Sequence, residues 1–230
     1  QENGIDHEKV AYCITDLEHN IKYSMNEKDE FIAASIYKLP LAMLYYDKVN
    51  EGEYTLDSTF TYSGYMHEDA GVISSDYGIG SQVPLSDLLN DLIIYSDNDA
   101  GHILYENLGG WKEYKEAMTK YTDSISENYY TMDNVTTANT MNDVVTYLYD
   151  HKEDYKGLIK NMEKAEPGEY LDRDTQLSMP QKYGMYDYAL NSVGFVECNT
   201  SYSIVVLTSL GDKGADVMAN INRIAYEHFK

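Results

Sequence analysis

The order of strand-like and helix-like segments constrains the fold of this chain more than any other feature of the sequence. Residues 9–15 are a mostly apolar run rich in residue types that favour strands, and 21–24 is a short partner strand that completes a hairpin. The segments 178–184, 191–198 and 202–209, near the other end, are three further strand candidates. Between them, apolar residues recur at helical spacing. We therefore expect an α+β fold with one antiparallel sheet, which is built from both termini and flanked by helices.

The middle of the chain is expected to be all helical. Helical patterns cover residues 36–50, 85–95, 100–107, 111–121, 141–150 and 155–163, and a last helix is expected over 213–229. The segments 55–84 and 124–140 are polar and lack periodicity, so we expect them to be irregular. A long irregular segment inside a compact domain often forms the rim of a functional site.

The length of the chain suits one domain with ample core. We expect a single domain over 1–230, with an α/β lobe from about 1–30 and 165–230 and a helical lobe over about 31–164. Ligand sites commonly form where two such parts meet, so a cleft between the sheet and the helical lobe is the expected place for one.

Charge and composition exclude several classes of function. A net charge of −22 argues against nucleic acid and anionic membrane surfaces as partners. No apolar run reaches the 18 residues that a membrane span requires. The histidines have no metal-ligand spacing, so we expect no metal and no cofactor, and His102 is interpreted as a core residue. Cys13 and Cys198 can form a disulfide or remain buried thiols, and free thiols are favoured.

A serine and a lysine three residues apart open the first expected helix. Ser35 precedes the apolar run that starts at Ile36, and Lys38 follows. Residues three apart lie on one face of a helix, so the Lys38 amine can reach the Ser35 hydroxyl. Ser35 also lies at the helix N-terminus, where free N–H groups and the dipole favour negative charge. A nucleophilic serine needs such a base and such a setting, although an ordinary N-cap with a solvated lysine has the same pattern.

Two further motifs follow the first in the chain. They are Ser96-Asp97-Asn98, between two expected helices, and Lys182-Tyr183-Gly184, on an expected strand. Each has an ordinary explanation, as a helix cap and as an edge-strand lysine. The three motifs occur in this order and each in a suitable context. One shared function explains this better than three separate ordinary explanations.

A Ser-x-x-Lys, a Ser-Asp-Asn and a Lys-Thr-Gly-like motif in this order are the signature of class A β-lactamases and penicillin-binding proteins. The chain resembles this class A β-lactamase-like family of penicillin-binding serine acyl-transferases from about Val10 to Phe229. The resemblance is closest over 31–43 and 88–104. It implies a β-lactamase/transpeptidase-like fold and a serine active site.

The resemblance also implies a role for each motif residue. Ser35 would be the nucleophile and Lys38 the base, with a pKa lowered by burial and by a second cation such as Lys182. Ser96 would pass a proton to the leaving nitrogen, with Lys182 holding it, and Asn98 would bind the amide of the substrate. The N–H groups of Ser35 and Met185 would form the oxyanion hole. Tyr183 lies at a substrate-binding position, and Gly184 allows close approach along the strand.

The sequence departs from the family at two places. Tyr183 stands where the family has Thr or Ser, and the only arginines, Arg173 and Arg223, lie outside the strands after Gly184 that often supply a carboxylate anchor. The loop before residues 136–137 lacks the family's Glu-x-x-Leu-Asn motif, whose glutamate activates the deacylating water.

Two acids of this shortened loop, Glu127 and Asp133, are candidates for the glutamate by position only. A solvated loop acid is the better interpretation of each.

These features predict a serine hydrolase or acyl-transferase of the β-lactamase and D-Ala-D-Ala peptidase type. It would form an acyl-serine with β-lactams or D-alanyl peptides and deacylate slowly. The alternatives are an efficient class A β-lactamase and a penicillin sensor or degenerate binding domain without turnover. Intact Lys38 and Ser96 favour an enzyme, and the missing glutamate favours slow deacylation. We further expect an exported, secreted or cell-surface monomer, with a signal segment outside this sequence and a small-molecule substrate.

Overall fold

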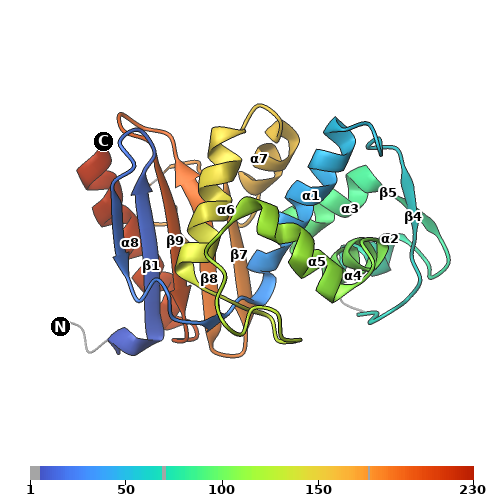
Figure 1. Cartoon of the computed structure of the whole chain (residues 1–230), viewed down its shortest axis with the longest axis horizontal. Coiled ribbons are helices and arrows are strands. Elements are labelled where there is room, and N and C mark those ends of the chain that lie inside the picture. The colour runs from blue at the N-terminus through green and yellow to red at the C-terminus, as the bar shows by residue number, and fades with distance from the viewer. Residues whose placement is uncertain (1–5, 69–70, 176) are drawn as a thin grey trace.

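A five-stranded antiparallel sheet, made from both ends of the chain, forms one half of the computed structural model (Figure 1). The structure describes residues 6–68, 71–175 and 177–230. The strands are β1 (Val10–Asp16), β2 (Lys22–Met25), β7 (Gln181–Tyr186), β8 (Ala189–Val196) and β9 (Tyr202–Thr208), in the order β2-β1-β9-β8-β7. The expected α+β fold is therefore confirmed.

Helices cover both faces of this sheet, which explains why every residue of the central strands β8 and β9 is buried. Side chains alternate between the faces of a strand. Ile204 and Val206 of β9 pack with α8 (Lys213–Phe229), whereas Val205 and Leu207 belong to the larger core that includes α6 (Ala138–Asp150). Period-two alternation thus divides the interior into two apolar layers.

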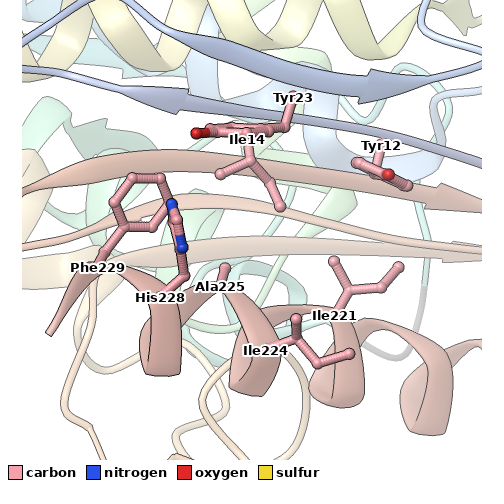
Figure 2. A pocket seen from close by; sticks show the side chains of 8 residues that line it. All are labelled: Tyr12, Ile14, Tyr23, Ile221, Ile224, Ala225, His228 and Phe229. Carbon is pink, nitrogen blue, oxygen red and sulfur yellow. The ribbon is translucent and has the colours of Figure 1, made fainter.

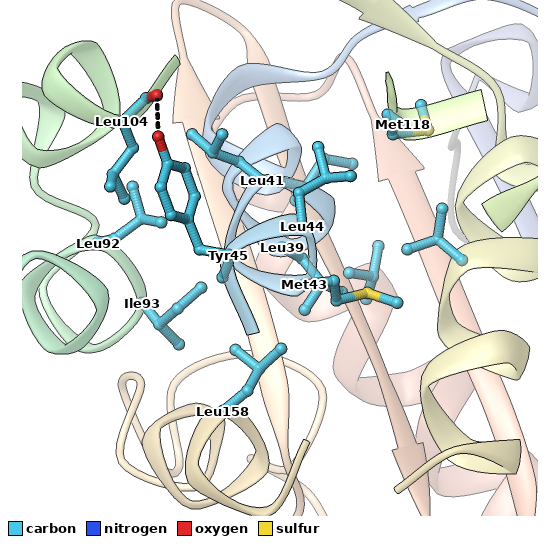
Figure 3. Packing of buried hydrophobic residues seen from close by; sticks show 14 of the residues in the cluster. Leu39, Leu41, Met43, Leu44, Tyr45, Leu92, Ile93, Leu104, Met118 and Leu158 are labelled. Atoms are coloured by element: carbon cyan, nitrogen blue, oxygen red, sulfur yellow. Dashed lines mark hydrogen bonds between the residues drawn. The ribbon is translucent and has the colours of Figure 1, made fainter. Parts of the chain in front are cut away.

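The larger core is centred on α1 (Lys38–Asn50), whose first eight residues are all buried. Figure 3 shows Leu41, Leu44 and Tyr45 of this helix among side chains from its neighbours. Those neighbours are α3 (Leu85–Ile94), α4 (Asn98–Asn107), α5 (Trp111–Met118) and α7 (Lys156–Met162). Because α1 is surrounded, its N-terminal turn is fixed rigidly relative to the sheet.

The segments expected to be irregular contain short elements. The strands β4 (Thr59–Thr61) and β5 (Gln82–Pro84) pair with each other, and α2 (Val72–Asp76) lies between them. The strands β3 (Phe31–Ile32) and β6 (Val135–Thr136) pair likewise, and three 3₁₀ helices are η1 (His7–Lys9), η2 (Ala34–Tyr37) and η3 (Thr119–Tyr121). Helix α6 begins three residues before its expected start because the Thr137 hydroxyl accepts a hydrogen bond from Thr140 N at 3.0 Å.

An apolar groove of about 360 Å³ lies between α8 and the edge of the sheet formed by β1 and β2 (Figure 2). Its lining includes Tyr12, Ile14 and Tyr23 from the strands and Ile221 and Ile224 from the helix. None of the residues of the three motifs lines it.

The described cysteines are free thiols, as favoured from the sequence. Cys13 is buried in β1, and burial raises its pKa to about 11, so it is a poor nucleophile. Cys198 is half-buried rather than fully buried. No helix in the described ranges has the length and hydropathy to cross a membrane.

Candidate active site

Ser35 lies in the 3₁₀ helix η2, one turn before α1, and not at the N-terminus of the α-helix itself. Ala34 has a φ of +50°, a left-handed conformation that is unusual for a residue with a Cβ. Two asparagine amides hold this turn: Asn134 Nδ2 donates to Ala34 O at 2.9 Å, and Asn191 Nδ2 donates to Ile32 O at 2.8 Å. Strained backbone that is held from outside in this way is typical of functional sites.

Strand β7 passes directly beside the Ser35 turn, and Gly184 makes this approach possible. A Cβ at Gly184 would lie 2.6 Å from Ser35 N and 2.8 Å from Ile36 N, which no side chain tolerates. The glycine therefore admits the backbone of the serine turn, in addition to the close approach along the strand that was expected from the sequence. Met185, the next residue, is exposed at the cavity described below.

The Lys38 side chain is fully buried and makes its hydrogen bonds to the Ser96-Asp97-Asn98 loop. Its Nζ donates to Ser96 O and to Asn98 Oδ1, both at 2.5 Å, and lies 3.5 Å from Ser96 Oγ. Among the described residues, the amine does not bond to the Ser35 hydroxyl, contrary to the simple helical expectation. Residues three apart eclipse in a 3₁₀ turn, so Ser35 and Lys38 still share a face. The amine instead donates its hydrogen bonds to Ser96 O and Asn98 Oδ1.

Burial lowers the pKa of Lys38 from 10.5 to about 7, while the charges of Asp97 and Glu68 partly oppose this shift. Burial and the neighbouring Lys182 were both expected from the sequence to lower this pKa, and burial is the dominant cause. It is the pKa of Lys182 that the charge of Lys38 lowers, after the larger effect of burial. At neutral pH a large share of Lys38 is therefore without its proton.

The second motif forms the junction between α3 and α4. Ser96 has a φ of +57°, and Asp97 caps α4 by accepting from Ala100 N at 2.8 Å. Asp97 is thus the helix cap that the ordinary explanation anticipated. Ser96 and Asn98, on either side of it, are directed toward the two lysines, because both hydrogen-bond with lysine amines.

Lys182 is fully buried on β7, and its Nζ donates to Ser96 Oγ at 2.9 Å and to Tyr183 O at 2.6 Å. The Ser96 hydroxyl is therefore shared between the two lysines. The Tyr183 ring stacks on Tyr170, with centroids 4.9 Å apart, and its centroid lies 4.2 Å from Lys182 Nζ. Tyr183 thus covers the amine with an aromatic face.

A cavity of about 700 Å³ opens over Ser35, bordered by η2, α4, β7 and the loops 66–68 and 132–135. Its lining includes Ser35, Asn98 and Met185 of the candidate site, and also His102 and Glu68. His102 is buried, as expected of a core residue, but its position at this cavity was not expected. The lysines lie behind the cavity floor, since neither belongs to the lining.

A third buried lysine holds the loop on one side of the cavity. Lys115 Nζ donates to the backbone oxygens of Tyr129, Thr131 and Asp133 at 2.6, 2.8 and 2.5 Å. Asp133 lines the cavity, whereas Glu127 is exposed in the same loop and does not line it. Of the two positional candidates, only Asp133 therefore lies at the cavity over Ser35.

Sequence reasoning missed four residues that shape the site: Asn134, Asn191, Lys115 and Glu68. The two asparagines and Lys115 act on backbone groups of distant segments, which no spacing along the chain reveals. Glu68 lies in the segment 55–84, whose lack of periodicity indicated a functional rim but not which residue mattered.

Comparison with known proteins agrees with this arrangement. A model of the beta-lactamase enzyme family matches residues 4–229, and the chain therefore belongs to this family. A beta-lactamase from Chitinophaga pinensis has a similar structure, with a TM-score of 0.80 and 22% identity over 96% of this chain and 94% of that one.

Two other solved structures have the same fold. PBP-A matches with a TM-score of 0.83 and 18% identity over 96% of this chain and 89% of that one, and so does a PBP-A mutant solved as an acyl-enzyme complex with penicillin G. The extended-spectrum beta-lactamase TLA-3 matches with a TM-score of 0.79 and 20% identity over 96% and 92%. At these identities the similarity establishes the fold.

Proposed function

We propose that this protein is a serine acyl-transferase or hydrolase that forms an acyl-serine with β-lactams or D-alanyl peptides and releases it slowly. The observation that carries the proposal is the placement of two buried lysine amines on one serine hydroxyl, that of Ser96, beside a strained turn that presents Ser35 to a large cavity. Such a cluster has the parts of a nucleophile, a base and a proton path.

The acylation reaction would proceed in two steps. Neutral Lys38 takes the proton of the Ser35 hydroxyl, directly or through Ser96, while Oγ forms a bond to the carbonyl carbon of the substrate. The C–N bond of the lactam or peptide breaks, and its nitrogen receives a proton from Ser96, which Lys182 and Lys38 resupply. The backbone N–H groups of Ser35 and Met185 would stabilise the oxyanion.

The loop beside the cavity supports the proposal that this ester is hydrolysed slowly. Deacylation needs a base within hydrogen-bond reach of a water at the ester. Glu127 is exposed away from the cavity, and Asp133 is an exposed residue on a loop whose backbone is fixed by Lys115. An efficient β-lactamase remains the second candidate, because an acid that lines the cavity can activate such a water.

A chase experiment tests the proposed slow step. The protein is labelled with penicillin, the excess is removed, and adduct mass is followed over time. Losing a dedicated base costs roughly 10²–10⁴ in rate, so the adduct should persist for minutes or longer. Clearance within seconds would favour an efficient β-lactamase, and the absence of any adduct would favour a degenerate binding domain.

Replacing Tyr183 is expected to speed acylation. Its ring covers Lys182 Nζ and leaves no short hydroxyl for a substrate carboxylate. A hydrogen bond from a threonine hydroxyl to that carboxylate should raise the acylation rate constant about tenfold in Tyr183→Thr. Tyr183→Phe is the matched control, because it keeps the ring and should acylate like the parent. A slower Phe variant would show that the phenol hydroxyl itself has a productive role.

The proposed substrates are found outside the cytoplasm of bacteria, so we propose that the protein is exported. We also propose that it acts as a monomer.

A further inference from the structure

The charged groups that line the cavity over Ser35 have one sign. Among the described residues of the lining, they are Glu68 and Asp133, and both are exposed acids. The nearby cations, Lys38 and Lys182, are buried behind the floor and their pKa values are lowered by burial. A substrate that enters this cavity therefore meets negative charge first.

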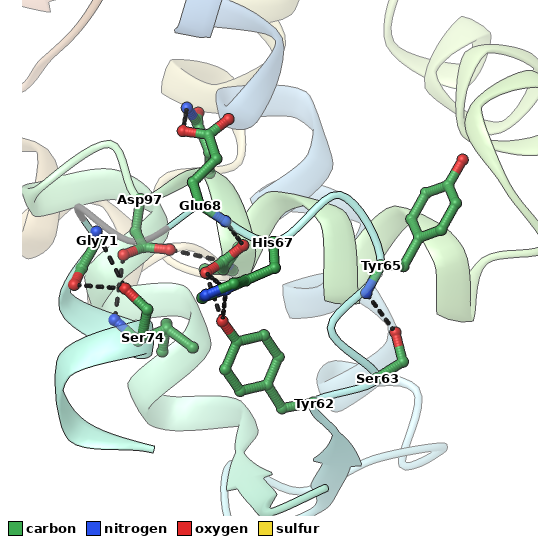
Figure 4. A network of polar contacts seen from close by, with 12 residues as sticks. Tyr62, Ser63, Tyr65, His67, Glu68, Gly71, Ser74 and Asp97 are labelled. Atoms are coloured by element: carbon green, nitrogen blue, oxygen red, sulfur yellow. Dashed lines mark hydrogen bonds and ion pairs between the residues drawn. The ribbon is translucent and has the colours of Figure 1, made fainter. Parts of the chain in front are cut away.

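Hydrogen bonds of its backbone and its carboxylate fix the position of Glu68 at this cavity (Figure 4). Its backbone N donates to Asp99 Oδ1 at 3.0 Å, and Asp99 Oδ2 accepts from the Tyr62 hydroxyl at 2.6 Å. Asp99 is 1% exposed, so the anchor of the loop is buried in α4. The Glu68 carboxylate accepts from Asn98 Nδ2 at 2.7 Å.

Because the Glu68 carboxylate contacts Asn98, its negative charge acts on the part of a substrate that Asn98 binds. Under the proposed function, Asn98 binds the amide in the acyl part of the substrate, so Glu68 lies beside the acyl side chain and not beside the leaving group. His102 lies one turn further along α4, 7% exposed, and its Nδ1 has no hydrogen-bond partner among the described residues. This part of the cavity thus offers the Glu68 carboxylate to a ligand, whereas the unpartnered His102 nitrogen is itself buried.

We infer that Glu68 selects acyl donors that carry an ammonium group in the acyl side chain, such as an aminopenicillin or a D-alanyl peptide with a free amine. The inference rests on the proposed function. An ammonium group pairs with Glu68 as a charge-assisted hydrogen bond, and it replaces the donor that Asn98 now provides. A carboxylate at the same position is repelled by Glu68 and Asp133 together.

Three penicillins that differ at one carbon test this preference. Ampicillin carries an amino group at the α-carbon of its side chain, penicillin G carries hydrogen, and carbenicillin carries a carboxylate. Acylation rate constants are measured by intact mass at about pH 6, below the usual pKa of an α-amino group. The parent protein should acylate fastest with ampicillin and slowest with carbenicillin, with about threefold to tenfold between successive compounds. The differences should shrink at high salt, because the site is solvent-exposed.

Single substitutions of acidic residues test which carboxylate causes the preference for an ammonium group. Glu68→Gln keeps the shape of the side chain and should remove most of the difference between the three compounds, and Asp133→Asn should remove less. Glu51→Gln, an exposed acid at the far end of α1, should leave the order unchanged.

Equal rates for the three compounds in the parent protein, or an unchanged order in Glu68→Gln, would overturn the inference while leaving acylation intact. Failure of all three compounds to form an adduct would instead contradict the proposed function.

Discussion

Ser35→Ala is expected to abolish the penicilloyl adduct completely, because Ser35 is the only serine, threonine or cysteine among the described residues that line the cavity. The substitution removes one hydroxyl from a half-buried residue that makes no side-chain hydrogen bond among the described residues. Its effect on the free energy of unfolding should therefore stay within about 1 kcal/mol. Intact-mass spectrometry with penicillin measures the adduct, and a thermal melt measures stability.

Ser75→Ala, at an exposed serine of α2, is the matched control and should label like the parent. Peptide mapping of the parent adduct should place the added mass on the segment that contains Ser35. A persistent adduct in Ser35→Ala, or an added mass on another residue, would contradict the assignment of the nucleophile.

Lys38→Arg is expected to lower the acylation rate constant by roughly 10²–10⁴, the usual cost of losing a positioned general base. Arginine keeps the positive charge but cannot lose its proton in the working pH range. Lys48→Arg, on the same helix but half-buried near its C-terminal end and paired with Glu53, should have no effect. A rate within a few-fold of the parent would make Lys38 an electrostatic or structural residue only.

The pH dependence of the parent protein checks the same role without a substitution. Burial lowers the pKa of Lys38 to about 7, and only the neutral amine can accept a proton. Acylation should therefore fall about tenfold per pH unit below 7 and level off above it. An amine with the ordinary pKa of 10.5 would instead give a rate that keeps rising through pH 9.

The fold could be predicted from the sequence because its signals are local. Strand-like runs at both ends and helical periodicity between them led to the sheet and the helices, with end points shifted by a few residues. The short strands β3 to β6 were missed, since two- and three-residue pairings depend on partners distant in the chain. The early start of α6 depends on the Thr137 cap, whose hydroxyl was not considered as a signal.

The three motifs determined which residues meet, and the structure brings Lys38, Ser96, Asn98 and Lys182 into one hydrogen-bonded cluster beside Ser35. Residue type and order were enough for this, because two motifs lie at helix ends and the third lies on β7, and the fold dictates the positions of these elements.

The tertiary structure alone decided how these residues are tuned. Burial sets the pKa of Lys38, the close approach of β7 requires Gly184, and the Tyr183 ring lies over Lys182. It also brought Glu68, a residue of no recognisable motif, to the amide of Asn98. Desolvation, backbone contact and the sign of a charge beside a cavity all depend on atoms that are distant in the chain, and for that reason the sequence by itself could not supply them.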